Sequence, residues 1–154
     1  MSDDLPIASI PRAGDRLWVV GDLYTFKATG AETGGAYTAV EIPVSPGNGT
    51  PVHRHSREDE AFYVIEGEVQ FVVDGCSFVA AAGALVHAGR GTEHAYANRS
   101  SVPARMLVVA VPAGIERFFG EIGEPVAGAE GPAPAPDIER IVRVAPRYGL
   151  EIVG

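Results

Sequence analysis

The sequence predicts an all-β protein, folded as a small barrel of short strands with short helices near its C-terminal end. Three observations support this prediction. About eight or nine short apolar stretches are separated by turn signals roughly every 8–12 residues, a spacing typical of β-sandwiches and barrels. Glycine and proline, which favour turns, are numerous at 19 and 12 of 154 residues. No internal repeat is visible, which favours one barrel over two.

The composition limits the class of protein. A chain of 154 residues suffices for one domain with a substantial core, and 46% apolar and 21% charged residues are ordinary values for a globular protein. The net charge of −8 and the lack of a basic cluster argue against binding to nucleic acid. The single cysteine, Cys76, excludes an intrachain disulfide and a cluster of thiolates.

The N-terminal residues are acidic and lack the apolar segment of a secretory signal. No apolar run in the sequence approaches the roughly 18 residues that a membrane-spanning helix needs. We therefore expect a cytoplasmic protein with no membrane partner.

Residues 1–35 are expected to form an N-terminal arm and edge strands. The arm is polar and contains proline. The strand candidates are residues 17–20 and 23–27, which are joined by a Gly-Asp turn. Residues 28–35 are rich in glycine and are expected to be a loop.

Residues 36–111 are expected to form the barrel core. The first strand, residues 36–44, alternates so that Val40, Ile42 and Val44 share one face. An Asp-Gly pair at residues 74–75 separates two apolar stretches and is the strongest short hairpin signal in the chain. The other strand candidates are residues 61–65, 68–73, 76–80, 84–88, 93–98 and 104–111.

Residues 112–154 are expected to form a helix, a Pro/Ala linker and a terminal helix that packs on the barrel. The first helix carries an apolar stripe with helical spacing, namely Ile115, Phe118, Phe119 and Ile122. This stripe is expected to pack on the outside of the barrel or to close one end. A lid or a dimer contact is the alternative.

Asp137 is a plausible cap for the terminal helix, and Pro146 should end or kink that helix. The tail, residues 150–153, is expected to be a strand or irregular. The apolar face of the terminal helix would consist of Ile138, Ile141, Val142 and Ala145.

Candidate functional residues lie in residues 47–67, GNGTPVHRHSREDEAFYVIEG. His53 and His55 are two positions apart, so on a β-strand they face the same side. Glu60 has the wrong parity to join them on one continuous strand, but the polar residues 56–59 predict a bend that returns Glu60 toward the imidazoles. Two imidazoles and a carboxylate are the beginnings of a site for a divalent metal of borderline softness.

Two segments of the sequence resemble the motifs of the cupin superfamily. The first motif is complete and consists of Gly47, His53, His55, Glu60 and Gly67. The second motif consists of Gly83, Gly89, Gly91, His94 and Asn98. Gly89 stands where the family has proline, which gives the loop before His94 more conformational freedom.

The resemblance implies a double-stranded β-helix, also called a jelly-roll barrel, and covers residues 36–111 best. The chain is most similar to single-domain bacterial cupins of the quercetin 2,3-dioxygenase-like type. Membership of that group implies a homodimer. The motifs predict fold and metal binding more strongly than they predict the reaction, because one fold hosts many activities.

The resemblance also implies that His53, His55, Glu60 and His94 hold one divalent transition metal. Three imidazoles and a carboxylate suit Fe, Mn, Ni, Zn, Co or Cu, whereas the lack of thiolates and the few oxygen ligands argue against Mg and Ca. Glu60 is either a plain ligand or the catalytic group that accepts a proton from a substrate hydroxyl. The alternative is that these are surface histidines and a solvated acid. His87, outside both motifs, is expected at the surface or beside a pocket.

Strand parity predicts the residues beside the metal. Phe62 and Val64 share the parity of Glu60, whereas Tyr96 and Asn98 share that of His94. We therefore expect Phe62, Tyr96 and Asn98 to line a substrate pocket, with Val64 in the core.

These features predict a metal-dependent, dioxygenase-like oxidoreductase. Its small aromatic or enolic substrate would coordinate the metal directly, with dioxygen as co-substrate. Two alternatives stay open: a redox-neutral cupin enzyme, such as an isomerase, decarboxylase or hydrolase, and a non-catalytic cupin that binds a metal or small ligand. We also expect removal of residues 137–154 to leave metal binding intact.

Overall fold

The computed structural model describes residues 15–126 and 131–153, so most of the expected arm and part of the linker lie outside the described residues. Its helices are α1 (Gly30–Thr33), α2 (Ile115–Ile122), α3 (Ile138–Val144) and the 3-10 helix η1 (Ala145–Tyr148). Its strands are β1 (Asp15–Val19), β2 (Asp22–Ala28), β3 (Thr38–Val44), β4 (His53–His55), β5 (Asp59–Glu66), β6 (Glu68–Val73), β7 (Cys76–Ala81), β8 (Leu85–Ala88), β9 (His94–Ala97), β10 (Ala104–Val111), β11 (Glu124–Pro125) and β12 (Leu150–Ile152).

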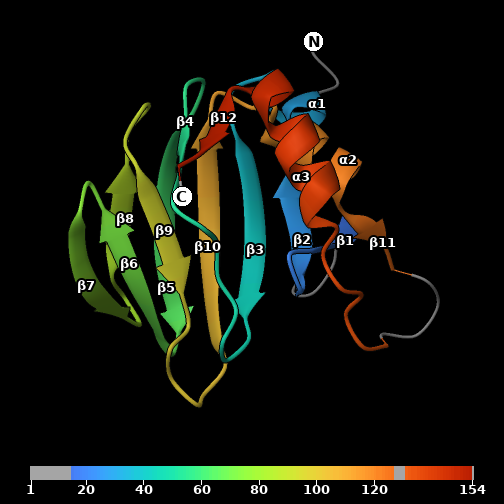
Figure 1. The fold of residues 1–154 in the computed structure, drawn as a ribbon. Helices are drawn as coiled ribbons and strands as arrows, with labels where there is room; N and C mark the ends of the chain where they lie inside the picture. The colour runs from blue at the N-terminus through green and yellow to red at the C-terminus, as the bar shows by residue number, and fades with distance from the viewer. Residues whose placement is uncertain (1–14, 127–130, 154) are drawn as a thin grey trace, which may run out of the picture.

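Two antiparallel sheets enclose the core, as Figure 1 shows. The seven-stranded sheet has the order β11-β1-β2-β3-β10-β5-β8, and the five-stranded sheet has the order β12-β4-β9-β6-β7. This arrangement confirms the predicted all-β jelly-roll barrel with short C-terminal helices.

Alternating side chains build the core between the sheets. Val40, Ile42 and Val44 on β3 are buried, as their shared parity predicts. The predicted hairpin at residues 74–75 joins β6 to β7. Asp74 and Gly75 have φ angles of 49° and 77°, which the tight turn of a two-residue hairpin requires.

Gly67 shows why the first motif ends in glycine. It joins β5 to β6 with a φ of 75°, a backbone conformation that L side chains rarely adopt. A Cβ atom at this position would lie 2.9 Å from the Cα atom of Ala104. Only glycine therefore allows the chain to turn this closely past the start of β10.

The segment at residues 28–35 was expected to be a loop, but it contains the single-turn helix α1. The backbone N–H of Thr29 donates to Glu32 at 3.1 Å, and the helix ends at Gly34, whose φ is 66°. One turn is too short to show the apolar periodicity on which helix prediction rests.

Helix α2 has the bounds that its apolar stripe predicts, and it closes one end of the barrel. Ile115, Phe118 and Ile122 are buried against the core. The Glu116 carboxylate anchors the start of the helix by accepting hydrogen bonds from the Gly30 and Gly114 backbones, both at 2.9 Å. Figure 1 shows α2 and α3 gathered beside β1 and β2, away from β6 and β7.

Helix α3 is capped as predicted, because the Asp137 side chain accepts a hydrogen bond from the Arg140 backbone at 3.0 Å. Its predicted apolar face is confirmed in part: Ile141 packs against the core and Ala145 is buried, but Ile138 and Val142 are 62% and 54% exposed. The chain then tightens into η1 at Pro146. No helix within the described ranges is long and apolar enough to cross a membrane.

The tail forms a strand, β12, that pairs antiparallel with β4. Leu150 lies opposite His55, and Ile152 lies opposite His53. Residues 150–152 therefore lie directly beside the strand that carries His53 and His55. The expectation that residues 137–154 are dispensable for metal binding stays a prediction, and this pairing argues against it.

Candidate metal centre

Three histidines converge inside the barrel. His53 and His55 point to the same side of β4, and His94 on β9 is the direct partner of His53 in the sheet. Each offers a ring nitrogen, and these atoms lie within 4.8 Å of one another. All three side chains are buried, which removes the alternative of surface histidines.

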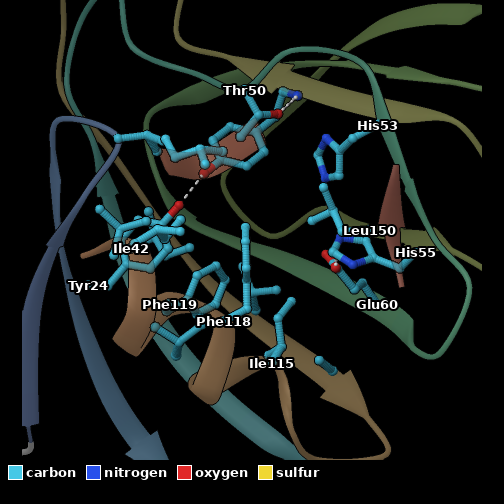
Figure 2. Close-up of a pocket in the computed structure, with 18 of the residues that line it drawn as sticks. Tyr24, Ile42, Thr50, His53, His55, Glu60, Ile115, Phe118, Phe119 and Leu150 are labelled. Carbon is cyan, nitrogen blue, oxygen red and sulfur yellow. Dashed lines mark hydrogen bonds and ion pairs between the residues drawn. The ribbon is translucent and has the colours of Figure 1, made fainter. Parts of the chain in front are cut away.

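Glu60 joins the three histidines from the facing sheet. The chain bends after β4 and returns as β5, which points the Glu60 side chain at the imidazoles. One carboxylate oxygen lies 2.6 Å from Nε2 of His55, and the other lies 3.8 Å from Nε2 of His94. Figure 2 shows His53, His55 and Glu60 together at one side of a pocket.

Backbone carbonyls hold two of the rings in one tautomer. Nδ1 of His53 lies 2.8 Å from the Pro51 carbonyl, and Nδ1 of His94 lies 2.9 Å from the Thr92 carbonyl. A carbonyl oxygen only accepts, so both Nδ1 atoms carry hydrogen and donate. The lone pairs of the neutral rings are therefore on Nε2, as a metal ligand of this kind requires.

Buried polar atoms at the centre lack hydrogen-bond partners. Among the described residues, Nε2 of His94 and Oε1 of Glu60 have none, although Oε1 of Glu60 lies close to His55 without hydrogen-bond geometry. An unpaired buried polar group costs about 1–3 kcal/mol. A divalent cation among these atoms would remove that cost, so the residues fit a metal.

The charges of the four residues are strongly coupled. Burial, followed by the charge of His94, lowers the pKa of His53 to about 4. Burial alone would also lower the pKa of His55, but Glu60 and Glu58 outweigh it and raise that pKa to about 9. Burial disfavours ionisation of Glu60, yet the charge of His55 holds the Glu60 pKa well below its ordinary value. At neutral pH the cluster thus holds a proton on His55 and a negative charge on Glu60.

Glu58 was not predicted as a site residue, because it lies within the predicted polar bend. It is only 5% exposed, and one of its oxygens lies 3.4 Å from Nδ1 of His55. A carboxylate behind a ligand histidine orients the ring and raises its basicity. The sequence signal that could have identified Glu58 is its position between His55 and Glu60, two candidate ligands of the first motif.

We expect metal binding at pH 7 to release one proton from His55, because a metal needs the lone pair that this proton occupies. The pKa of about 9 means that the apparent affinity should rise about tenfold per pH unit and level off above pH 9. Calorimetric titration with Zn²⁺ in buffers of different ionisation enthalpy measures the protons released. Glu58→Gln should shift the plateau to lower pH. Proton release near zero at pH 7 would contradict this assignment.

The loop before His94, where Gly89 replaces proline, is held by hydrogen bonds. The Gly91 backbone donates to the His55 carbonyl at 2.8 Å, and the Thr92 backbone donates to the Gly89 carbonyl at 3.0 Å. The loop therefore contacts two candidate ligands, His55 through Gly91 and His94 through the Thr92 carbonyl, despite the freedom that glycine confers. The fourth histidine, His87, is exposed and away from the cluster.

A cavity of about 90 Å³ adjoins the cluster. Phe62 and Tyr96 line it, as expected, but Asn98 does not. The Asn98 amide donates to the Val44 and Val102 carbonyls at 2.9 and 2.8 Å, so this side chain holds the loop after β9. The prediction from strand parity was wrong for Asn98, because β9 ends at residue 97 and the chain turns after it.

Several other wall residues come from outside the predicted barrel core. They are Tyr24 on β2, Ile115, Phe118 and Phe119 on α2, and Leu150 on β12. The apolar stripe of α2 was the available sequence signal for the helix. No local signal assigned Tyr24 or Leu150 to the cavity, because their position depends on sheet pairing.

Comparisons with known proteins agree with this architecture. Residues 40–110 match the family model described as the cupin domain. Quercetin 2,3-dioxygenase of Bacillus subtilis is 25% identical over 119 residues, which are 77% of this chain and 35% of that protein. The present chain thus spans about a third of the length of this curated relative.

Two solved structures extend the comparison. A RmlC-like cupin from Shewanella frigidimarina superimposes with a TM-score of 0.62 at 22% identity, covering 71% of this chain and 93% of that one. A sugar phosphate isomerase of the cupin superfamily from Silicibacter pomeroyi gives 0.51 at 26% identity, covering 59% of each chain. The match of residues 40–110 to the cupin domain, together with the jelly-roll topology, identifies the barrel of this chain as a cupin barrel.

Proposed function

We propose that this protein is a metal-dependent cupin enzyme whose substrate binds in the cavity beside His53, His55, Glu60 and His94. The observation that carries the proposal is the convergence of three buried imidazoles on one carboxylate, with Nδ1 of His53 and His94 held by backbone carbonyls. The donor set suits Fe, Mn, Ni, Zn, Co or Cu. When bound, such a metal supplies Lewis acidity that lowers the pKa of a coordinated hydroxyl.

The residues of the chain provide the remaining functions. His53, His55 and His94 present nitrogen ligands, and Glu60 keeps its negative charge at neutral pH because its pKa is held low. Glu60 is then either a fourth ligand or the acceptor of a substrate proton. The walls from α2 and β12 are apolar, and a low local dielectric constant strengthens electrostatic interactions inside the site.

Our finer proposal is a dioxygenase-like reaction on a small enolic or aromatic substrate, with dioxygen as co-substrate. Similarity to quercetin 2,3-dioxygenase supports it. The likeness to a sugar phosphate isomerase favours redox-neutral chemistry instead. No lysine or arginine is among the described residues that line the cavity, so His55, whose pKa is raised to about 9, is the cationic side chain there. The homodimer expected from the resemblance stays a prediction.

Metal analysis followed by oxygen uptake tests this proposal. The protein is purified without chelator or nickel resin, and uptake is measured with flavonols, catechols and β-diketones. Near-stoichiometric metal with substrate-dependent uptake would support the dioxygenase. Stoichiometric metal without uptake would favour the redox-neutral enzyme or a binding protein. A protein that takes up no metal after reconstitution would overturn the proposal as a whole.

Glu60→Gln separates the two roles of the carboxylate. We expect this variant to bind metal about 10–100-fold more weakly, because the carboxylate oxygens lie 2.6 and 3.8 Å from the Nε2 atoms of two ligand histidines. Metal content after dialysis is the measurement, with the exposed residue in Glu151→Gln as control. Full metal content combined with lost turnover would instead assign Glu60 as the proton acceptor.

A further inference from the structure

Two tyrosine hydroxyls meet at the far side of the cavity. The hydroxyl oxygens of Tyr24 and Tyr96 lie 3.0 Å apart, and both side chains are buried and line the cavity. Figure 2 shows Tyr24 across the pocket from His55 and Glu60. Tyr24 lies on β2, outside the residues that match the cupin family, so this pair is a feature of the chain rather than of the motifs.

The pair has one hydrogen-bond donor in excess. Two phenols carry two hydroxyl hydrogens, but they share one hydrogen bond, and the described residues provide no other partner for either hydroxyl. Burial raises the pKa of both tyrosines, so both keep their hydrogens at neutral pH. One buried O–H group is therefore left at the cavity without an acceptor.

Packing alone explains the rings but not the hydroxyls. The Tyr24 ring packs edge-on against Phe119 with centroids 5.1 Å apart, and the Tyr96 ring lies 6.2 Å from Phe62. Phenylalanine would fill these positions as well, without the cost of removing two hydroxyls from water. A ligand oxygen that accepts the remaining hydrogen would offset this cost.

The cavity also limits the ligand. Its volume of about 90 Å³ is smaller than the roughly 150 Å³ of a cavity that holds benzene. Away from the metal cluster the walls are mainly apolar and contain no lysine or arginine. These properties favour a short molecule, uncharged away from the metal, over a flavonol, a phosphate ester or a dicarboxylate.

We propose that the Tyr24–Tyr96 pair donates a hydrogen bond to the carbonyl oxygen of a short aliphatic substrate, whose other end reaches the histidine cluster. The pair is a positioning and specificity site rather than a catalytic one. This assignment rests on the proposed function, because it takes the cavity beside the metal centre as the substrate site. It narrows the expected substrate from small aromatic or enolic molecules to short carbonyl compounds.

The test uses a neutral probe that needs no metal. Butanone labelled with ¹³C at its carbonyl is titrated by NMR into the full-length protein as purified and into the double variant Tyr24→Phe/Tyr96→Phe, in which neither hydroxyl remains to donate. The double variant should weaken butanone binding about three- to tenfold, as expected for loss of one hydrogen bond. It should also shift the bound carbonyl resonance upfield. Tyr63→Phe, which changes a half-exposed tyrosine, is the matched control.

A second ligand separates hydrogen bonding from packing. 2-Methyl-1-butene replaces the carbonyl oxygen by CH₂, so its affinity should not fall in the double variant. Equal losses for both ligands, or no loss for butanone, would overturn the role of the pair. Metal analysis on the same samples is an independent measurement: a protein without metal refutes the proposed function, while the butanone titration still decides the role of the tyrosines.

Discussion

His94→Ala is expected to abolish metal binding while the barrel still folds. His94 is 2% exposed, and its Nε2 atom has no hydrogen-bond partner among the described residues, so a metal is the partner that this nitrogen fits. Loss of a ligand should exceed the 10–100-fold effect of losing a supporting residue, so we expect more than about a 100-fold fall in affinity. Metal content after dialysis and the circular dichroism spectrum are the measurements.

The matched control is His87→Ala, because His87 is an exposed histidine away from the cluster. This variant should keep its metal. His53→Ala provides a second test at a different position in the cavity wall, in case the small space left by His94→Ala affects folding. Folded His53→Ala or His94→Ala protein with full metal content would show that the ligand assignment is wrong.

Deletion of residues 150–154 is expected to weaken metal binding at least tenfold and to lower the thermal stability. Strand β4 carries His53 and His55 but has only three residues, and β12 covers one of its edges. Leu150 is buried against the cavity, and loss of a buried leucine side chain costs about 2–5 kcal/mol. Without β12, β4 keeps its pairing with β9 through His53 and His94. Zn²⁺ titration and the melting temperature are the measurements.

Glu151→Ala is the matched control for this deletion. Glu151 belongs to the same strand but points outward, and its side chain pairs with Arg54 at 2.7 Å on the surface. Exposed ion pairs contribute about 0–1 kcal/mol, so this variant should keep both its metal and nearly all of its stability. A deletion variant with wild-type affinity for Zn²⁺ would show that β12 does not help to hold the ligands.

The sequence by itself determined the strands, because they follow from local spacing. It also predicted the candidate metal ligands, of which His94 followed from the resemblance to the cupin motifs. Alternation along β3 predicted its buried face, and the Asp-Gly turn predicted the β6–β7 hairpin. The same rule of parity predicted that His53 and His55 point together, and the polar bend predicted that Glu60 returns to them. The reaction class did not follow from spacing, since the same ligands serve many chemistries.

The tertiary structure decided which residues surround those ligands. Leu150 and Tyr24 reach the cavity through the pairing of β12 with β4 and the place of β2 in the larger sheet. Glu58 lies behind His55, and Asn98 holds a loop instead of lining the pocket. Each of these positions depends on contacts between segments distant in the sequence or on the exact turn of a loop. Local periodicity carries no information about such contacts, so only the folded chain reveals the cavity and its donors.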